Sequence, residues 1–265
     1  MMIERFFTMI GSPFVKSVSS LKTLGSFILF QLRVYPLLFK GFSRSQLFFK
    51  QVEVIGIGTI GVVVLTAMFT GMVESIQLYK GFHDFGVESF IGYTIFVSIT
   101  KELGPVFATL MLISRAVSAM AAELGTMRVT EQIDAIETLG VDSKAYLIVP
   151  RIMATTLSLP LLVITFDFVA ISSAYLISTT VLGVNPTAYQ DTIMQLGHFS
   201  DIGSGLIKAL VFGLLVSSIG TYMGYFTRGG ARGVGQATIK AVVYSAVSIF
   251  IANYFLSSFF LFLGW

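Results

Sequence analysis

The sequence predicts an all-α membrane protein: an N-terminal interfacial amphipathic helix, five transmembrane helices, and a short cytoplasmic helix between spans 2 and 3. Hydrophobic residues make up 55% of the 265 residues and charged residues only 12%, about half the charged share of a soluble domain. The mean hydropathy is +0.85, and several long stretches carry no charge. These observations exclude an ordinary soluble enzyme, a disordered regulator and a disulfide-stapled secreted domain.

The first 50 residues differ from the rest. Their longest stretch without a charge, 23–32, has ten residues, which is too short to cross a bilayer. Apolar residues recur with a helical period from Phe14 to Ile28 and alternate with basic ones, as in a helix that lies in the membrane interface. A cleaved signal peptide is the competing interpretation, although no apolar core is followed by a small-residue cleavage site.

Five later stretches have the length of about 20 residues that a membrane span requires. The second and third contain charges but have strongly apolar flanks. No repeat or linker separates the spans, so we expect one domain over 1–265, with an interfacial segment at 1–50 and a five-span bundle at 54–265. The five stretches are 54–73, 89–114, 152–179, 209–227 and 241–265.

The basic residues predict the orientation of these spans. Of the 17 Lys and Arg residues, 14 lie in the N-terminal segment and in the connections between spans 2 and 3 and between spans 4 and 5. Because the basic side of a membrane protein is usually cytoplasmic, we expect a cytoplasmic N-terminus and a periplasmic C-terminus. The same distribution explains the net charge of +3 without nucleic-acid binding.

The chain shows no sign of a nucleotide, metal or cofactor site. The Gly56–Gly61 stretch has the spacing of a dinucleotide fingerprint but lies inside an apolar span with no preceding strand. The run from Arg228 to Gly235 lacks the Gly-Lys-Ser/Thr ending of a phosphate loop, so any ATP hydrolysis would belong to another chain. The chain has no cysteine and only two histidines, so we expect no metal site and no cofactor.

The connection between spans 2 and 3 contains a short amphipathic helix. Its apolar and acidic residues each recur every three to four positions, so the helix has an apolar side and an acidic side. A solvated helix covering the membrane surface would explain this pattern. Anionic headgroups disfavour an acidic surface, however, and a protein partner is the alternative explanation. The residues are Val129, Ile133, Ile136 and Leu139 on the apolar side and Glu131, Asp134 and Glu137 on the acidic side.

A longer pattern resembles the MlaE (YrbE) family of ABC permeases. It consists of Lys101-Glu-Leu-Gly-Pro105, the stretch from Ser114 to Asp142, and Val149-Pro-Arg151, and the resemblance extends from about residue 45 to the end. It implies a homodimeric permease in the bacterial inner membrane with two copies of a cytoplasmic ATPase, a periplasmic MCE-domain protein and often a STAS-domain protein. The implied cargo is glycerophospholipid, moved between inner and outer membranes to maintain outer-membrane lipid asymmetry.

The resemblance also implies residue roles. The acidic helix would be the coupling helix, in which Glu131, Asp134, Glu137 and Gly140 transmit ATPase movement. Two positions depart from the family pattern. Ser143 replaces a common Pro, which we expect to loosen the start of span 3, and Asn253 stands where some members carry an acidic residue. The lipid-binding residues would be Lys101, Glu102 and Lys208, with Gln77 and Phe82 in or beside the outer loop at the cavity rim.

Lys101 and Glu102 lie about 18 Å into span 2, where a lone charge costs at least about 2.5–3.5 kcal/mol. Neighbouring residues on a helix point about 100° apart, so we expect their partners on other helices or in a wet cavity. They form a network that holds helices together, a polar floor beneath a lipid cavity, or both. Lys208 either joins them or extends outward to the interface.

Three further charges have structural interpretations. We expect Asp167 to make a helix-packing or outer-cavity hydrogen bond, and Arg115 and Glu123 to anchor the end of span 2. Two other functions stay open at this point: a membrane scaffold that recruits cytoplasmic proteins through its acidic helix, and a permease for small polar solutes.

Overall fold

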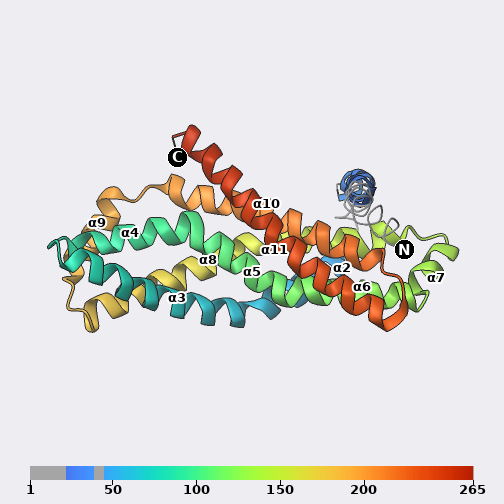
Figure 1. Cartoon of the computed structure of the whole chain (residues 1–265), viewed down its shortest axis with the longest axis horizontal. Helices are drawn as coiled ribbons and strands as arrows, with labels where there is room; N and C mark the ends of the chain where they lie inside the picture. The colour runs from blue at the N-terminus through green and yellow to red at the C-terminus, as the bar shows by residue number, and fades with distance from the viewer. Residues whose placement is uncertain (1–21, 39–44, 265) are drawn as a thin grey trace, which may run out of the picture.

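The computed structural model describes residues 22–38 and 45–264, and throughout these residues the chain forms helices and turns without any strand. This confirms the predicted all-α class. Figure 1 shows a long bundle whose helices run along the long axis of the molecule.

Within the described residues, five helical segments are long and apolar enough to cross a membrane. This confirms the predicted number of spans. The first segment begins at Ser45, inside the stretch assigned to the interface, because the helix at 45–52 continues directly into the apolar run. The segments are Ser45–His83, Glu88–Val129, Lys144–Thr180, Phe199–Tyr225 and Gly230–Phe262.

π-helical turns interrupt the first two spans and begin the third. Such a turn inserts an extra residue into the helical repeat and changes the direction of the side chains around it. Pro105 stands at the start of a new α-helix directly after one of them, where its missing N–H costs little. Span 1 consists of α2 (Ser45–Val52), η2 (Glu53–Ile57) and α3 (Gly58–His83); span 2 of η3 (Glu88–Phe90, a 3-10 turn), α4 (Ile91–Ser98), η4 (Ile99–Leu103), α5 (Gly104–Leu112), η5 (Ile113–Val117) and α6 (Ser118–Val129); and span 3 of η6 (Lys144–Ile148) and α8 (Val149–Thr180).

The helix α8 forms the centre of the bundle, between α3 of span 1 and α10 (Phe199–Tyr225), which is span 4. In its most apolar stretch 72% of the residues are buried, against 17% for α11 (Gly230–Phe262), which is span 5. Close approach requires glycine at Gly71, where an added Cβ would lie 2.0 Å from the Ala170 carbonyl oxygen. Gly220 and Gly224 of α10 similarly lie against Val117 and Ala121 of the second span, which is the close packing that a Gly-x-x-x-Gly spacing favours.

The helix at 22–38 does not run with the spans. Figure 1 shows it nearly end-on, so its axis lies across the long axis of the bundle, as expected for a helix in the membrane interface. It is held to α10 by a hydrogen bond of 3.0 Å from Gln31 Nε2 to the Ser218 carbonyl oxygen. The remaining residues assigned to the interfacial segment, 1–21 and 39–44, lie outside the described residues.

Two short helices lie in the connections, at opposite ends of the bundle (Figure 1). The predicted helix between spans 2 and 3 is α7 (Gln132–Thr138). The helix α9 (Pro186–Leu196) between spans 3 and 4 was not predicted. Its signal is present in the sequence: Asn185 accepts hydrogen bonds from two backbone N–H groups of the first turn and Pro186 follows it, as is common at helix starts.

Candidate functional site

A network of charged and polar side chains lies inside the bundle, where η4, α10 and α11 meet. Lys208 Nζ donates hydrogen bonds to Glu102 Oε1 at 2.7 Å, to the Lys101 carbonyl oxygen at 2.8 Å and to Ser257 Oγ at 2.8 Å. Glu102 also accepts from Ser257 Oγ and from Asn253 Nδ2, both at 2.8 Å. We call Lys101, Glu102, Asp201, Lys208, Asn253 and Ser257 the central network.

The second half of the central network is an ion pair between Lys101 Nζ and Asp201 Oδ1 at 2.8 Å. The other oxygen of Asp201 accepts the backbone N–H of His198 at 2.9 Å, which completes a capping box at the start of α10. Asp201 is 3% exposed, so it balances a cation inside the protein. Asp201 is not among the site residues predicted from the sequence, although an acidic residue three positions after a helix N-cap is a recognised signal.

The π-helical turn η4 separates the two neighbouring charges. Lys101 reaches the first turn of α10, whereas Glu102 reaches the middle of α10 and α11. Both partners lie on other helices, as the helical geometry predicts. Lys208 lies inside the central network and does not extend outward. Asn253 donates a hydrogen bond to Glu102. This position therefore contributes an amide dipole in place of the negative charge that an acidic residue would carry here.

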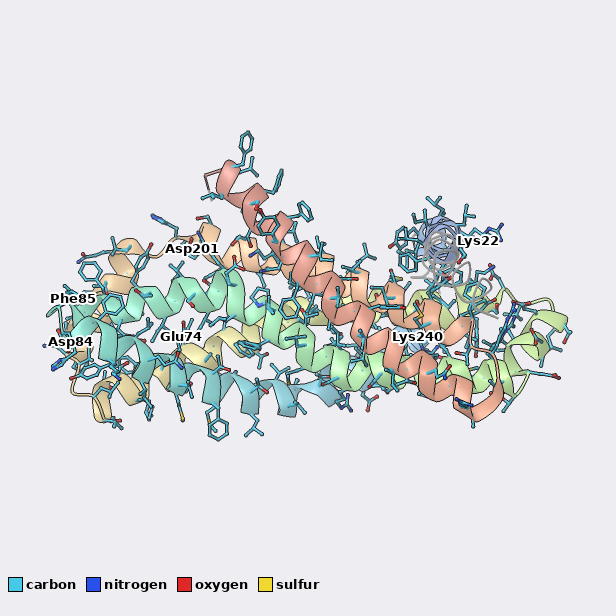
Figure 2. The ribbon with its side chains drawn as sticks, in the orientation of Figure 1. Lys22, Glu74, Asp84, Phe85, Asp201 and Lys240 are labelled. Carbon is cyan, nitrogen blue, oxygen red and sulfur yellow. The ribbon has the colours of Figure 1, made fainter. Side chains whose placement is uncertain are left out.

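A groove of about 420 Å³ lies beside the central network, between α3 and span 2. Its lining is mostly apolar, but Glu74 and Gln77 contribute polar groups, and Leu103 follows Glu102 directly in the chain. Glu74 Oε1 accepts a hydrogen bond of 2.6 Å from Ser98 Oγ. Figure 2 shows Glu74 and Asp201 along the bundle, away from the end that carries Asp84 and Phe85. The lining residues are Phe69, Thr70, Val73, Glu74, Gln77, Leu103 and Phe107.

The predicted rim residues lie in different surroundings. Gln77 lines this groove. Phe82 lies in the last turn of α3 and packs partly buried against the core, so it belongs to the helix and does not line the groove. Phe85, in the loop that follows, is 82% exposed.

The coupling residues gather around α7 at the other end of the bundle. Ile133 is fully buried, and Ile136 packs against the core. Leu139 was expected on the apolar side, but the helix ends at Thr138 and the next turn directs Leu139 outward, where it is 80% exposed. Glu131 and Gly140, both with positive φ, flank the helix.

Of the three acidic residues in and beside α7, two are held by the chain itself. Asp134 Oδ1 accepts from Arg128 Nη1 at 2.6 Å. Glu137 Oε1 accepts from Ser143 Oγ at 2.5 Å and from Tyr225 Oη at 3.0 Å, and these bonds lower the pKa of Glu137 below its usual value. Ser143 is buried, and its hydroxyl ties α7 to Tyr225 of α10. Two of the residues on the acidic side of α7 therefore form hydrogen bonds within the chain.

The remaining charged residues join helices. Arg115 Nη1 donates to the Val54 carbonyl oxygen at 3.0 Å, and Glu123 pairs with Arg151 at 2.8 Å. Asp167 is 8% exposed, and among the described residues its Oδ1 has no hydrogen-bond partner, in contrast to the expected packing bond. Across 22–38 and 45–264, no three His, Asp or Glu side chains form a group that could hold a metal ion.

Comparison with known proteins identifies a family that matches this chain. Residues 48–259 match the family model described as Permease MlaE. A probable ABC transporter permease protein of Rickettsia bellii is 39% identical over 245 residues, which are 92% of this chain and 95% of the relative. The intermembrane phospholipid transport system permease protein MlaE of Haemophilus influenzae is 31% identical over 258 residues, 97% of this chain and 98% of the relative.

A plant relative extends the comparison. The chloroplast protein trigalactosyldiacylglycerol 1 of Arabidopsis thaliana is 41% identical over 211 residues, which are 80% of this chain and 60% of the relative. The family match at 48–259 covers nearly all of the five apolar segments. This multi-pass membrane protein therefore belongs to the MlaE family of ABC transporter permeases.

Proposed function

We propose that this chain is the transmembrane permease of an ABC system that moves glycerophospholipids between the inner and outer membranes of a diderm bacterium and so maintains outer-membrane lipid asymmetry. The observation that carries the proposal is the groove beside the central network. Its apolar wall suits acyl chains, and Glu74 and Gln77 suit the polar part of a lipid. The name of the Haemophilus influenzae relative, a phospholipid transport permease, supports the same cargo.

The central network acts in this proposal as a polar floor beside the groove. Glu102 has a side chain that is 43% exposed although its partner Lys208 is 2% exposed, so the carboxylate is open on one side. An amphipathic molecule then enters beside the Glu102 carboxylate. It is not held there tightly, because Lys208 is already paired with Glu102. Lys101, Glu102 and Lys208 form this floor, and Gln77 lines the groove.

The remaining parts of the proposal concern partners and orientation. Two copies of the chain work as a homodimer, with α7 on the cytoplasmic side contacting a separate ABC ATPase and the α9 end facing a periplasmic MCE-domain protein. A STAS-domain protein is a further partner. The supporting observations are the basic residues near the α7 end and the exposed Leu139, which is large and apolar and follows the end of α7.

The test is gentle purification of the full-length protein from its own host, followed by mass spectrometry of the proteins and lipids that accompany it. We expect an ABC ATPase and glycerophospholipid. The substitution Val73→Trp, which fills the groove, should remove lipid and transport while the ATPase stays bound. The matched control Phe168→Trp changes an exposed side chain of α8 outside the groove and should retain both.

Other outcomes would support other functions. Cytoplasmic proteins without an ATPase would favour a scaffold. A protein that keeps its ATPase but transports no lipid, whether or not Val73 is changed, would favour a polar-solute permease.

A further inference from the structure

A second groove lies away from the central network, where the helix at 22–38 crosses α10 and α11. It has a volume of about 440 Å³, and its walls are largely apolar. Leu24, Phe27 and Ile28 come from the crossing helix, Leu215 and Ile219 from α10, and Tyr244 from α11. We call it the interfacial groove.

A basic hollow adjoins the interfacial groove. This hollow has a volume of about 240 Å³, shares Tyr222 and Met223 with the groove, and reaches Arg228 and Lys240. In Figure 2, Lys240 and Lys22 lie toward the same end of the bundle. The two adjoining hollows together form a depression that is apolar along one part and cationic at the other.

The walls of the interfacial groove are held in place by specific contacts. Tyr222 Oη and Ser26 Oγ share a hydrogen bond, and the ring of Phe30 packs at 5.6 Å from that of Tyr222 and at 5.5 Å from that of Tyr225. With the bond from Gln31 to Ser218, these contacts fix the crossing helix on α10. The depression is therefore a feature of the packing of three helices.

The groove is open to its surroundings, since Leu24 is 58% exposed, Ile28 47% and Tyr244 47%. In a membrane these surroundings are lipid. This inference rests on the proposed orientation, in which the basic residues predict that this end of the bundle is cytoplasmic. The cytoplasmic leaflet is the one that is rich in anionic lipids. A molecule that complements the depression needs an acyl chain and a negative headgroup next to it.

We propose that the interfacial groove binds one anionic glycerophospholipid of the cytoplasmic leaflet, with its phosphate between Arg228 and Lys240 and an acyl chain along Leu24, Ile28 and Ile219. This lipid is a resident one: the interfacial groove shares no lining residue with the groove beside the central network. Its effect is to hold the crossing helix against α10 and α11. The proposal does not depend on lipid transport.

A local fluorescence measurement tests the site. Trp265 is the only tryptophan of the chain, so Trp265→Phe with Tyr244→Trp places a single reporter in the interfacial groove. The full-length protein is reconstituted in phosphatidylcholine vesicles that contain either brominated phosphatidylglycerol or brominated phosphatidylcholine at the same fraction. We expect phosphatidylglycerol to quench this tryptophan at several-fold lower mole fraction than phosphatidylcholine.

Two comparisons separate the site from general contact with lipid. In the first, Phe168→Trp in place of Tyr244→Trp reports from an exposed position of α8 and should show equal quenching by both lipids. In the second, Arg228→Gln with Lys240→Gln should remove the preference at position 244, because both charges that complement the phosphate are then absent. The charge-matched control Lys50→Gln with Arg232→Gln changes two exposed basic residues outside the groove and should keep the preference.

The outcomes decide the proposal independently of transport. A preference for phosphatidylglycerol that disappears only with Arg228 and Lys240 supports it. Equal quenching by the two lipids at position 244, a preference unchanged in the Arg228 and Lys240 variant, or a tryptophan that no lipid quenches because protein covers it, would each overturn it.

Discussion

The carboxylate of Glu102 lies 2.7 Å from the ammonium of Lys208, yet the two groups have very different surroundings. The side chain of Lys208 is 2% exposed and that of Glu102 is 43% exposed. Lys208 has the Lys101 carbonyl oxygen and Ser257 as further partners, whereas Glu102 has Asn253 and Ser257. Removing one partner of such a pair is costly mainly because the other is left uncompensated.

This asymmetry predicts unequal effects of the two isosteric substitutions. Glu102→Gln leaves a buried ammonium without its counter-charge and should lower the free energy of unfolding by about 3 kcal/mol. Lys208→Met leaves a half-exposed carboxylate with two neutral donors and should cost about 1 kcal/mol. Thermal unfolding of the purified protein in detergent measures both. Equal losses, or a larger loss for Lys208→Met, would contradict the prediction.

Exchanging the neighbouring charges, Lys101→Glu with Glu102→Lys, should impair the stability and lipid retention of the protein more severely than Ala at either position. The exchange keeps the total charge but directs a carboxylate at Asp201 and an ammonium at Lys208, since these are the partners of the two positions. Like charges placed together in this way cost several kcal/mol. Membrane insertion, thermal stability and retained lipid are compared in the three variants. An exchange variant as stable as wild type would show that the central network is not specific.

The sequence contains enough information for the spans because a membrane helix is specified by local composition. The length and apolar composition of the stretch 54–73, for example, are sufficient to predict span 1. The central network joins residues that are about a hundred positions apart, such as Lys101 with Asp201 and Glu102 with Lys208. The helical geometry predicts that partners exist on other helices, but only the packed structure says which.

Two other features were not predicted from the sequence because they depend on details of backbone geometry. Leu139 has the right spacing for the buried side of α7, and it is exposed only because the helix ends one residue earlier. The π-helical turn η4, which directs Lys101 and Glu102 to different partners, has no recognised sequence signature comparable to a helix cap. Local periodicity therefore predicted the helix α7 but not which face each of its residues occupies.

Gly104 should tolerate no side chain. A Cβ added there would lie 1.9 Å from Oδ1 of Asp167 and 2.9 Å from the Ile99 carbonyl oxygen, so Gly104→Ala should destabilise the protein by about 2 kcal/mol. Asp167→Asn should leave stability unchanged or raise it, because a buried carboxylate oxygen without a partner is unfavourable. Thermal unfolding measures both variants.

The control combines the two positions. Gly104→Ala with Asp167→Ala removes the clashing oxygen and should recover part of the stability, since only the contact with Ile99 remains. If the double variant is no more stable than Gly104→Ala alone, the contact between Gly104 and Asp167 does not cause the loss.

The anchoring of α7 should depend on pH through Glu137. Hydrogen bonds from Ser143 and Tyr225 lower its pKa in the folded protein, so its contribution is fully present above the usual pKa of a glutamate. It is lost as the pH falls through the lowered value. Glu137→Gln should therefore cost about 0.5–1 kcal/mol at neutral pH, and the difference from wild type should vanish in acid. Thermal unfolding from neutral pH into strong acid measures this difference, and one that persists there would exclude an ionised Glu137 as the anchor.

Leu139 should matter more for ATPase binding than Asp134 or Glu137. Its side chain is 80% exposed at the end of α7, whereas both carboxylates already accept hydrogen bonds from the chain. Burying a Leu side chain in an interface contributes about 2 kcal/mol, so Leu139→Ser should weaken the complex with the ATPase about 30-fold.

The matched control for Leu139 is Leu196→Ser, at the end of α9 on the opposite end of the bundle, where the side chain is 38% exposed. This variant should bind the ATPase as wild type does. Reversal of all three acidic residues, Glu131, Asp134 and Glu137, to Lys should also detach the ATPase, but in part by disturbing α7 itself, because Asp134→Lys faces Arg128. Co-purification of the ATPase at several protein concentrations distinguishes the variants. Full binding by Leu139→Ser would show that the ATPase contacts another surface, and full binding by the triple variant would show that the acidic residues serve only the fold of this helix.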